Sequence, residues 1–254
     1  MRVATAFTLL LVTTLFGCLH DEDDELSMAL AAGLPPDQIM GGVWEGVDSD
    51  GIGYLLTATE DGRLNSLSEI GEQGFGSGSV NGSDVTATYS LVPPFGSTLF
   101  DGSTSASCTA TGTIEERQTL DLTKSCTTDL GTNFSVTVEL TYNSIYELDS
   151  DRSVVEGIWD DLGAVLVIRA TGEIFEQDGC VFNGQIDPID TEFNLYEVGL
   201  TASNCMGPLV DLNGSVFSGV GIFDNTEPVD FQLWFATGEV QGTTVGILFE
   251  LERL

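Results

Sequence analysis

Along most of the chain, apolar and polar residues alternate with a period of two, which is typical of strands with one buried face. In residues 134–142 the even-numbered positions are Phe, Val, Val, Leu and Tyr, and the positions between them are Ser, Thr, Glu and Thr. Turn dipeptides that favour tight hairpins separate such strands. The pattern therefore predicts an all-β, antiparallel protein. The turn dipeptides are Asp50-Gly51, Asp61-Gly62, Asn81-Gly82, Asp101-Gly102, Asp178-Gly179, Asn183-Gly184 and Asn213-Gly214.

An internal repeat divides this β region into two parts, because three short matches recur in the same order. Gly42-Val43-Trp44 matches Gly157-Ile158-Trp159, Gly62-Arg63-Leu64 matches Gly172-Glu173-Ile174, and Gly78-Ser79-Val80 matches Gly184-Gln185-Ile186. We predict two tandem domains, residues 41–148 and 153–254. Each has about 100 residues, which is room for ~8 strands. Each domain is expected to form an antiparallel meander closed into a small up-and-down barrel, and two β-sandwiches are the alternative.

The Gly-x-Trp that opens each domain resembles the first strand of lipocalins and related small up-and-down barrels. The resemblance implies that Trp44 and Trp159 are structural core residues that plug one end of each barrel. Arg253 matches the arginine that this family places near its last strand, whereas the first domain has no such arginine, and neither has a Thr-Asp-Tyr-like loop motif. An eight-stranded barrel is just wide enough for its own side chains to fill, so a large ligand cavity is not expected.

The N-terminus has the pattern of an export signal. Met1-Arg2 supplies a positive charge, and residues 3–16 form an uncharged, largely apolar run that is too short for the ~20 residues of a membrane-spanning helix. We predict that residues 1–17 are a signal peptide that is removed.

The end of this segment, Leu15-Phe16-Gly17-Cys18, resembles the lipobox of bacterial lipoproteins. The resemblance implies cleavage before Cys18, a diacylglyceryl group on its thiol and an acylated amine (palmitate in the usual case), which together hold a protein durably at a membrane. An ordinary secretory signal with a chance cysteine is the alternative.

Residues 18–40 are predicted to be a lipidated linker, because five consecutive carboxylates, residues 21–25, repel one another and stay solvated. The acidic run is either a spacer or an export tag similar to those of surface-displayed lipoproteins. Leu19 after the cysteine favours, by the same resemblance, the outer membrane, on its periplasmic face or at the cell surface.

The composition is strongly acidic, with 40 acidic and 7 basic side chains and a formal net charge of -33. A phosphate backbone repels such a chain, which excludes nucleic acid as a partner. The one histidine, His20, cannot build a Ser-His-Asp triad in the β region or a multi-histidine metal site. The one lysine is Lys124. The 42% of hydrophobic residues is enough for a packed core.

Four cysteines remain once Cys18 is set aside, and an even number in an exported chain predicts two disulfides. Three pairings are possible, and bonds within each domain are the most economical. We therefore predict Cys108–Cys126 and Cys180–Cys205. A redox or zinc site is not expected, because the chain has no Cys-x-x-Cys motif.

No motif for catalysis or for a cofactor emerges. Adjacent carboxylates such as Glu115-Glu116 point to opposite faces of a strand and cannot share a substrate. Asp48 and Asp50 resemble part of a calcium loop, but the segment lacks the length and the closing Glu of a full site. A turn in which the aspartates bond their own backbone is the alternative. We expect no enzyme activity, no cofactor and no resident metal.

The most apolar strand, residues 231–235, places Trp234 on the outer face if Phe231, Leu233 and Phe235 face the core. Trp234 is then either a binding anchor or a residue packed between the two domains. Three functions remain. The first is a non-enzymatic envelope lipoprotein with a binding, interaction or structural role, whose partner is an envelope protein, a glycan or a small apolar ligand. The second is a lipocalin-like carrier of a small apolar ligand inside a barrel. The third, least favoured, is an enzyme that uses carboxylates.

Overall fold

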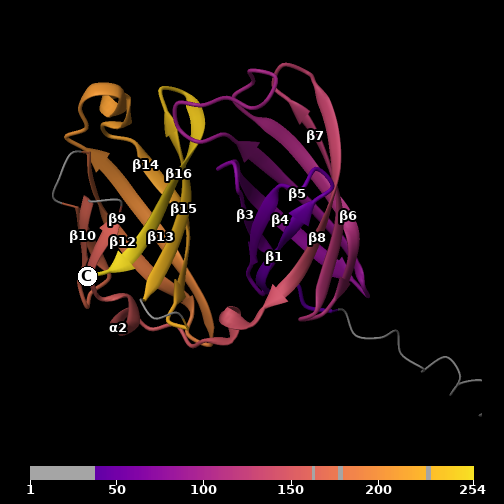
Figure 1. The fold of residues 1–254 in the computed structure, drawn as a ribbon, viewed down its shortest axis with the longest axis horizontal. Coiled ribbons are helices and arrows are strands. Elements are labelled where there is room, and N and C mark those ends of the chain that lie inside the picture. The colour runs from indigo at the N-terminus through magenta and orange to yellow at the C-terminus, as the bar shows by residue number, and fades with distance from the viewer. Residues whose placement is uncertain (1–37, 162–163, 177–179, 227–229) are drawn as a thin grey trace, which may run out of the picture. The chain divides into compact units, whose positions relative to one another are not determined.

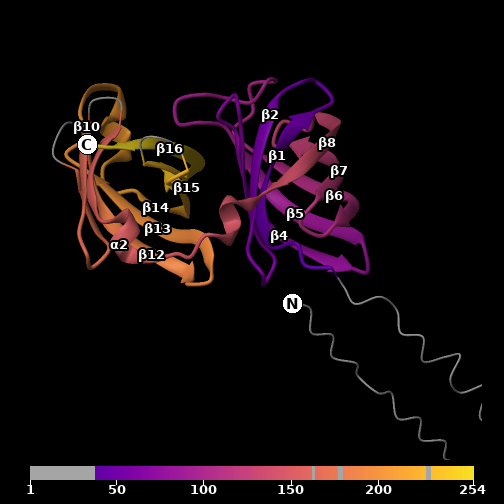
Figure 2. The ribbon, with the colours of Figure 1, turned by 60° about the horizontal axis from the view of Figure 1, so that its bottom comes forward.

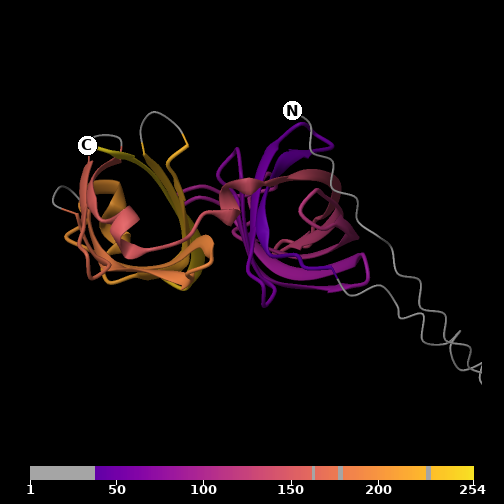
Figure 3. The ribbon, with the colours of Figure 1, turned by 90° about the horizontal axis from the view of Figure 1, so that it is seen from below.

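The computed structural model describes residues 38–161, 164–176, 180–226 and 230–254. Within them the chain forms two closed antiparallel barrels in tandem, each of eight strands linked in sequence order (Figure 1). Closure distinguishes this arrangement from two sandwiches, because β8 pairs with β1 and β16 pairs with β9. Figures 2 and 3 show each set of strands curling round to meet its own first strand. The predicted tandem barrels are therefore confirmed.

The first barrel lies between Gly42 and Asn143, and the second between Gly157 and Arg253. The first is β1 (Gly42–Asp48), β2 (Gly53–Ala58), β3 (Arg63–Ser68), β4 (Gln73–Asn81), β5 (Asp84–Val92), β6 (Ala106–Glu115), β7 (Thr119–Thr128) and β8 (Asn133–Asn143). The second is β9 (Gly157–Asp161), β10 (Ala164–Ile168), β11 (Glu173–Glu176), β12 (Val181–Asp190), β13 (Phe193–Ser203), β14 (Val216–Asp224), β15 (Phe231–Val240) and β16 (Thr243–Arg253). Short helical turns occur at η1 (Ser144–Glu147), α2 (Arg152–Val155) and η2 (Gly207–Leu212).

The signal peptide, the lipobox with Cys18 and the linker as far as residue 37 lie outside the described residues. Among the residues that are described, no helix has the length and apolarity needed to cross a bilayer.

The first strand of each barrel contains a buried, hydrogen-bonded tryptophan. Trp44 and Trp159 are both 0% exposed, and each indole Nε1 donates a hydrogen bond to the backbone carbonyl four residues earlier, Met40 at 3.1 Å and Val155 at 2.9 Å. In the second barrel the Arg253 guanidinium lies 4.7 Å from the centre of the Trp159 ring, a cation–π contact that covers the indole. The two tryptophans are thus equivalent core residues at one end of each barrel.

The strand registers test the three sequence matches of the repeat. Leu64 pairs with Gly76, whereas Ile174 pairs with Gly184. The first two matches are therefore structural equivalences, but the third is displaced by two residues, since Gly184 corresponds to Gly76. The two barrels differ in spacing at the first hairpin, because Trp44 pairs with Leu56 twelve residues later, whereas Trp159 pairs with Leu166 seven residues later. The several glycines of β4 make the third match ambiguous from sequence.

The exposed position predicted for Trp234 is wrong. Trp234 is 0% exposed inside the second barrel, and its Nε1 donates a hydrogen bond of 2.9 Å to Oε1 of Gln232. Phe235 points to the outer face instead, where it packs with Leu67 of the first barrel. Because both faces of β15 are largely buried, its apolar residues do not reveal which face is inward, and the inward face is the one that carries Gln232 and Trp234.

Both predicted disulfides are present. Cys108–Cys126 joins directly paired residues of β6 and β7, and Cys180–Cys205 joins the start of β12 to the segment after β13. All four cysteines are buried. The within-domain pairing is therefore confirmed.

Candidate functional site

The lumen of the first barrel contains the one lysine of the chain. Lys124, on β7, is 4% exposed. It lies in an inward-facing row because it pairs with Ala110 of β6 and Val136 of β8. Alternation along β7 explains this position: Leu120 and Cys126 lie on the same inward face, and residues two apart on a strand share a face.

Small residues beside Lys124 leave the lumen partly unfilled. Ala110 pairs with Ala87, which in turn pairs with Gly78. The centre of a water-sized sphere can occupy about 50 Å³ of the resulting cavity. This volume is enough for a small molecule and far below that of a drug-sized pocket. The walls of the cavity are mostly apolar. They are formed by Met40, Tyr54, Leu56, Leu64, Ser66, Gly74, Val85, Ala87, Tyr89, Ala110, Leu122, Lys124, Val138 and Leu140.

The second barrel fills the corresponding space with larger side chains. We compared the strand registers of the two barrels, starting from the matched residues Leu64 and Ile174. Each strand pair then shows which residue of the second barrel is equivalent to a given residue of the first. Several positions gain volume, which is why bulky residues close this interior. Examples, first barrel and then second, are Gly74 and Phe182, Gly78 and Ile186, Val85 and Tyr196, Ala87 and Val198, Cys108 and Phe217, Leu122 and Trp234, and Val138 and Phe249.

The same registers show that the second barrel has neither a lysine at the position of Lys124 nor a tyrosine at the position of Tyr54. Lys124 corresponds to Ala236, and Tyr54 corresponds to Ala164. An eight-stranded barrel of this type is thus built without either polar side chain. The pair is therefore a feature specific to the first lumen and is not needed to form the fold.

Lys124 and Tyr54 are in direct contact. The Nζ of Lys124 donates a hydrogen bond of 3.0 Å to the Tyr54 hydroxyl. It also lies 5.0 Å from the centre of the Tyr54 ring and 5.7 Å from that of Phe134, distances at which an ammonium is attracted to an aromatic face.

Among the described residues, Lys124 has no ion pair with a carboxylate, in contrast to the arginines. Each arginine of this part of the chain has a carboxylate oxygen within 3.3 Å. A buried ammonium without a paired charge is costly. The first lumen therefore holds an amine whose hydrogen-bonding and electrostatic needs are only partly met by the protein.

Burial sets the ionisation of this site. Desolvation lowers the pKa of Lys124, and the charges of Glu72 and Asp48 oppose that effect. Desolvation raises the pKa of Tyr54, with a further contribution from Asp48, and it raises the pKa of Tyr89 and of Glu72. Tyr54 and Tyr89 thus remain neutral phenols over the physiological range, and burial favours the neutral amine of Lys124.

Asp48 and Asp50, the weak calcium candidates, lie in the β1–β2 turn. Oδ1 of Asp48 accepts hydrogen bonds from the backbone N–H of Asp50 at 2.9 Å and of Ile52 at 3.0 Å. These bonds are those of an aspartate that stabilises its own turn. No cluster of three or more metal-binding side chains occurs in the described ranges, so the turn interpretation accounts for Asp48.

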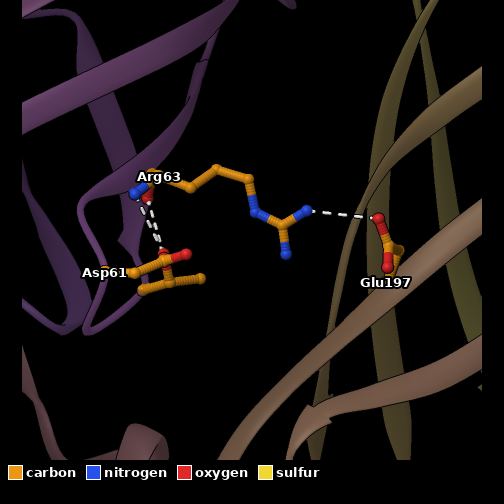
Figure 4. Close-up of polar contacts among 4 residues, drawn as sticks. Asp61, Arg63 and Glu197 are labelled. Atoms are coloured by element: carbon orange, nitrogen blue, oxygen red, sulfur yellow. Dashed lines mark hydrogen bonds and ion pairs between the residues drawn. The ribbon is translucent and has the colours of Figure 1, made fainter.

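A second polar feature joins residues of the two barrels. Arg63, on β3, reaches toward Glu197, on β13, with 3.2 Å between Nη1 and Oε1 (Figure 4). Thr59 donates a hydrogen bond to Asp61 beside it, and this bond lowers the pKa of the Asp61 carboxyl. The Arg63 and Glu197 side chains are 39% and 61% exposed, and exposed ion pairs of this kind contribute about 0–1 kcal/mol. This contact is therefore not a strong candidate for a binding site.

No protein-family model matches the chain, and no curated protein sequence matches it. The site must therefore be judged from its own residues.

The sequence shows Lys124 as the one lysine and predicts no role for it. The signal was available, because Lys124 shares its parity with Leu120 and Leu122 in an alternating strand. Tyr54 was missed as well. It could be found only by closing the barrel, since β2 and β7 are not neighbours in the sheet.

Proposed function

We propose that this chain is a lipid-anchored cell-envelope protein that acts as a non-enzymatic binding module, and that its ligand site is the lumen of the first barrel. One observation supports the lumen of the first barrel as the ligand site. Lys124, a buried amine without an ion pair, borders an apolar cavity, whereas alanine occupies the equivalent position in the second barrel. Sites that combine an apolar wall with few convergent polar groups are typical of small-molecule binding.

The cavity limits the ligand to a small molecule. A space of about 50 Å³ open to the centres of water-sized spheres limits the ligand to a molecule of about six non-hydrogen atoms or fewer. A long-chain lipid does not fit. The proposal therefore keeps the carrier hypothesis for a small apolar ligand and assigns the second barrel a structural role.

The envelope location is supported by the export signal and the lipobox that ends at Cys18, and by the two disulfides, which persist in oxidising compartments. The outer membrane is the proposed location, with the protein on its periplasmic face or at the cell surface.

A second candidate function is docking to an envelope protein or a glycan. The observation that favours it is a group of exposed apolar residues in and around η2, where Met206, Val210 and Val216 are 74%, 53% and 64% exposed. Exposed apolar groups of this kind often mark contact surfaces. Replacing Val210 with Asp should abolish such docking and leave binding in the lumen unchanged.

The test of the lumen site uses benzene and butanol as probes, with saturation-transfer NMR as the measurement. The full chain should bind both probes. Leu122→Trp introduces the residue found at the equivalent position of the second barrel and should abolish this binding. Ala87→Val also introduces the second-barrel residue, but it adds less volume and should only weaken the binding. Circular dichroism checks that each variant folds. Equal binding by the wild type and by folded Leu122→Trp would place the probes elsewhere and overturn the proposal, as would a wild type that binds neither probe.

A further inference from the structure

Lys124 has the surroundings of a reactive amine. An amine attacks a carbonyl carbon only in its neutral form, and burial favours that form. Lys124 is 4% exposed, and its Nζ lies beside the cavity rather than against a carboxylate. The nitrogen is therefore both desolvated and next to the space that a ligand would occupy.

The charges around the site select among ligands. Glu72 and Asp48 act electrostatically on Lys124, and the whole chain carries a formal net charge of -33. Both repel an anionic ligand, and the apolar walls cannot solvate a cationic one. A neutral molecule meets neither penalty. The apolar walls then favour a short hydrocarbon body, and the amine favours an electrophilic carbonyl group.

We propose that Lys124 forms a reversible imine with a small, neutral, apolar aldehyde that enters the lumen of the first barrel. This inference rests on the proposed function, because it specifies the ligand class of the same cavity.

The reaction balances without a further reagent. The nitrogen lone pair bonds to the carbonyl carbon while the C=O π electrons move to oxygen, and a proton passes from nitrogen to that oxygen to give a carbinolamine. The second nitrogen proton and the hydroxyl group then leave as water, and a C=N bond forms. Neither carbon nor nitrogen exchanges electrons with an external oxidant or reductant.

Tyr54 is a positioning residue in this scheme. Its hydroxyl accepts the hydrogen bond from Nζ at 3.0 Å, which holds the nitrogen at the cavity wall. Burial raises the pKa of Tyr54, and the negative charge of Asp48 and a hydrogen bond to that carboxylate raise it further, so the hydroxyl stays neutral. Alanine replaces both Lys124 and Tyr54 at the equivalent positions of the second barrel, so the hydrogen-bonded pair occurs in the first lumen and not at the equivalent positions of the second.

Because the chain has one lysine, imine formation can be measured at a single side chain. The full chain, purified from membranes in detergent, is treated with butanal and sodium cyanoborohydride, and peptide mapping by mass spectrometry locates the butyl group. We expect stoichiometric labelling of Lys124 at a rate at least about tenfold above that of N-acetyl-lysine amide, since the lumen holds the aldehyde next to the nitrogen. Lys124→Arg, which keeps a cationic side chain, should show no lumen labelling.

Tyr54→Phe should fold and slow the labelling of Lys124 several-fold, while leaving benzene binding intact, which a purely structural role for Tyr54 would not do. Labelling no faster than that of the model amide, in a protein whose lumen binds benzene and butanol, would overturn the imine and leave the proposed binding site standing. Failure of the neutral probes to bind would instead remove the binding site itself. Binding of butyrate in preference to butanol would also overturn the imine, because it would make Lys124 an anion receptor.

Discussion

The Nζ of Lys124 on β7 donates a hydrogen bond of 3.0 Å to the hydroxyl of Tyr54 on β2, across a barrel in which β8 and β1 separate the two strands. The contact bridges the lumen and draws an amine away from solvent. The second barrel has alanine at both equivalent positions. The two barrels therefore share a framework but not an interior, and the interior of the first carries the polar chemistry.

Replacing Lys124 with Met should stabilise the protein by about 1 kcal/mol at pH 7, because it removes a buried amine that has no ion pair. The gain should shrink as pH rises. Burial lowers the native pKa of Lys124 from 10.5, so between the native and unfolded pKa values the unfolded chain binds more protons, and the unfolding free energy of the wild type rises with pH. Urea unfolding of both proteins at pH 7 and about pH 9.5 measures this difference.

A difference between the wild type and Lys124→Met that stays constant over this pH range would mean that Lys124 titrates as in the unfolded chain. That outcome would contradict the burial of the amine.

A matched pair of glycine substitutions tests the registers of the second barrel. A Cβ on Gly184 would lie 1.8 Å from the backbone oxygen of Gly199, whereas a Cβ on Gly199 would meet no heavy atom within 4 Å. Gly184→Ala should therefore destabilise the protein by about 2 kcal/mol or more, and Gly199→Ala should change stability by less than about 0.5 kcal/mol. Thermal unfolding followed by circular dichroism compares them. Similar effects of the two variants would show that the register between β12 and β13 is wrong.

Removing either disulfide should cost about 3 kcal/mol of unfolding free energy, because each bond closes a loop of similar length. The separations are 18 residues for Cys108–Cys126 and 25 for Cys180–Cys205. Denaturant unfolding of the two double alanine variants tests this estimate. If Cys108→Ala with Cys126→Ala left stability unchanged, the bond beside the first lumen would not contribute to the fold.

Salt should stabilise the protein. The chain has 40 acidic and 7 basic side chains, so most carboxylates have no cationic partner and repel one another. Molar NaCl or millimolar Ca²⁺ screens or binds these charges. The melting temperature should rise in both, relative to dilute buffer at the same pH. A melting temperature that is flat across the three conditions would contradict a role for charge repulsion in stability.

Alternation and turn dipeptides predict the fold well, because hairpin barrels are built from local strand pairs, and the pairing of cysteines follows from the same domain division. The interior is harder to predict. Trp234 was assigned to the outer face because β15 is apolar on both faces, and the third repeat match was displaced because glycines occur at several positions of β4. The contact between Lys124 and Tyr54 depends on closure of the barrel, which no local pattern encodes.

The most direct test of the first lumen as a ligand site uses ¹³C-lysine labelling, which gives one Cε signal because the chain has one lysine. We expect benzene to shift this signal in the wild type and to leave it unchanged in folded Leu122→Trp. A wild-type signal that benzene does not move would contradict a ligand site in the first lumen.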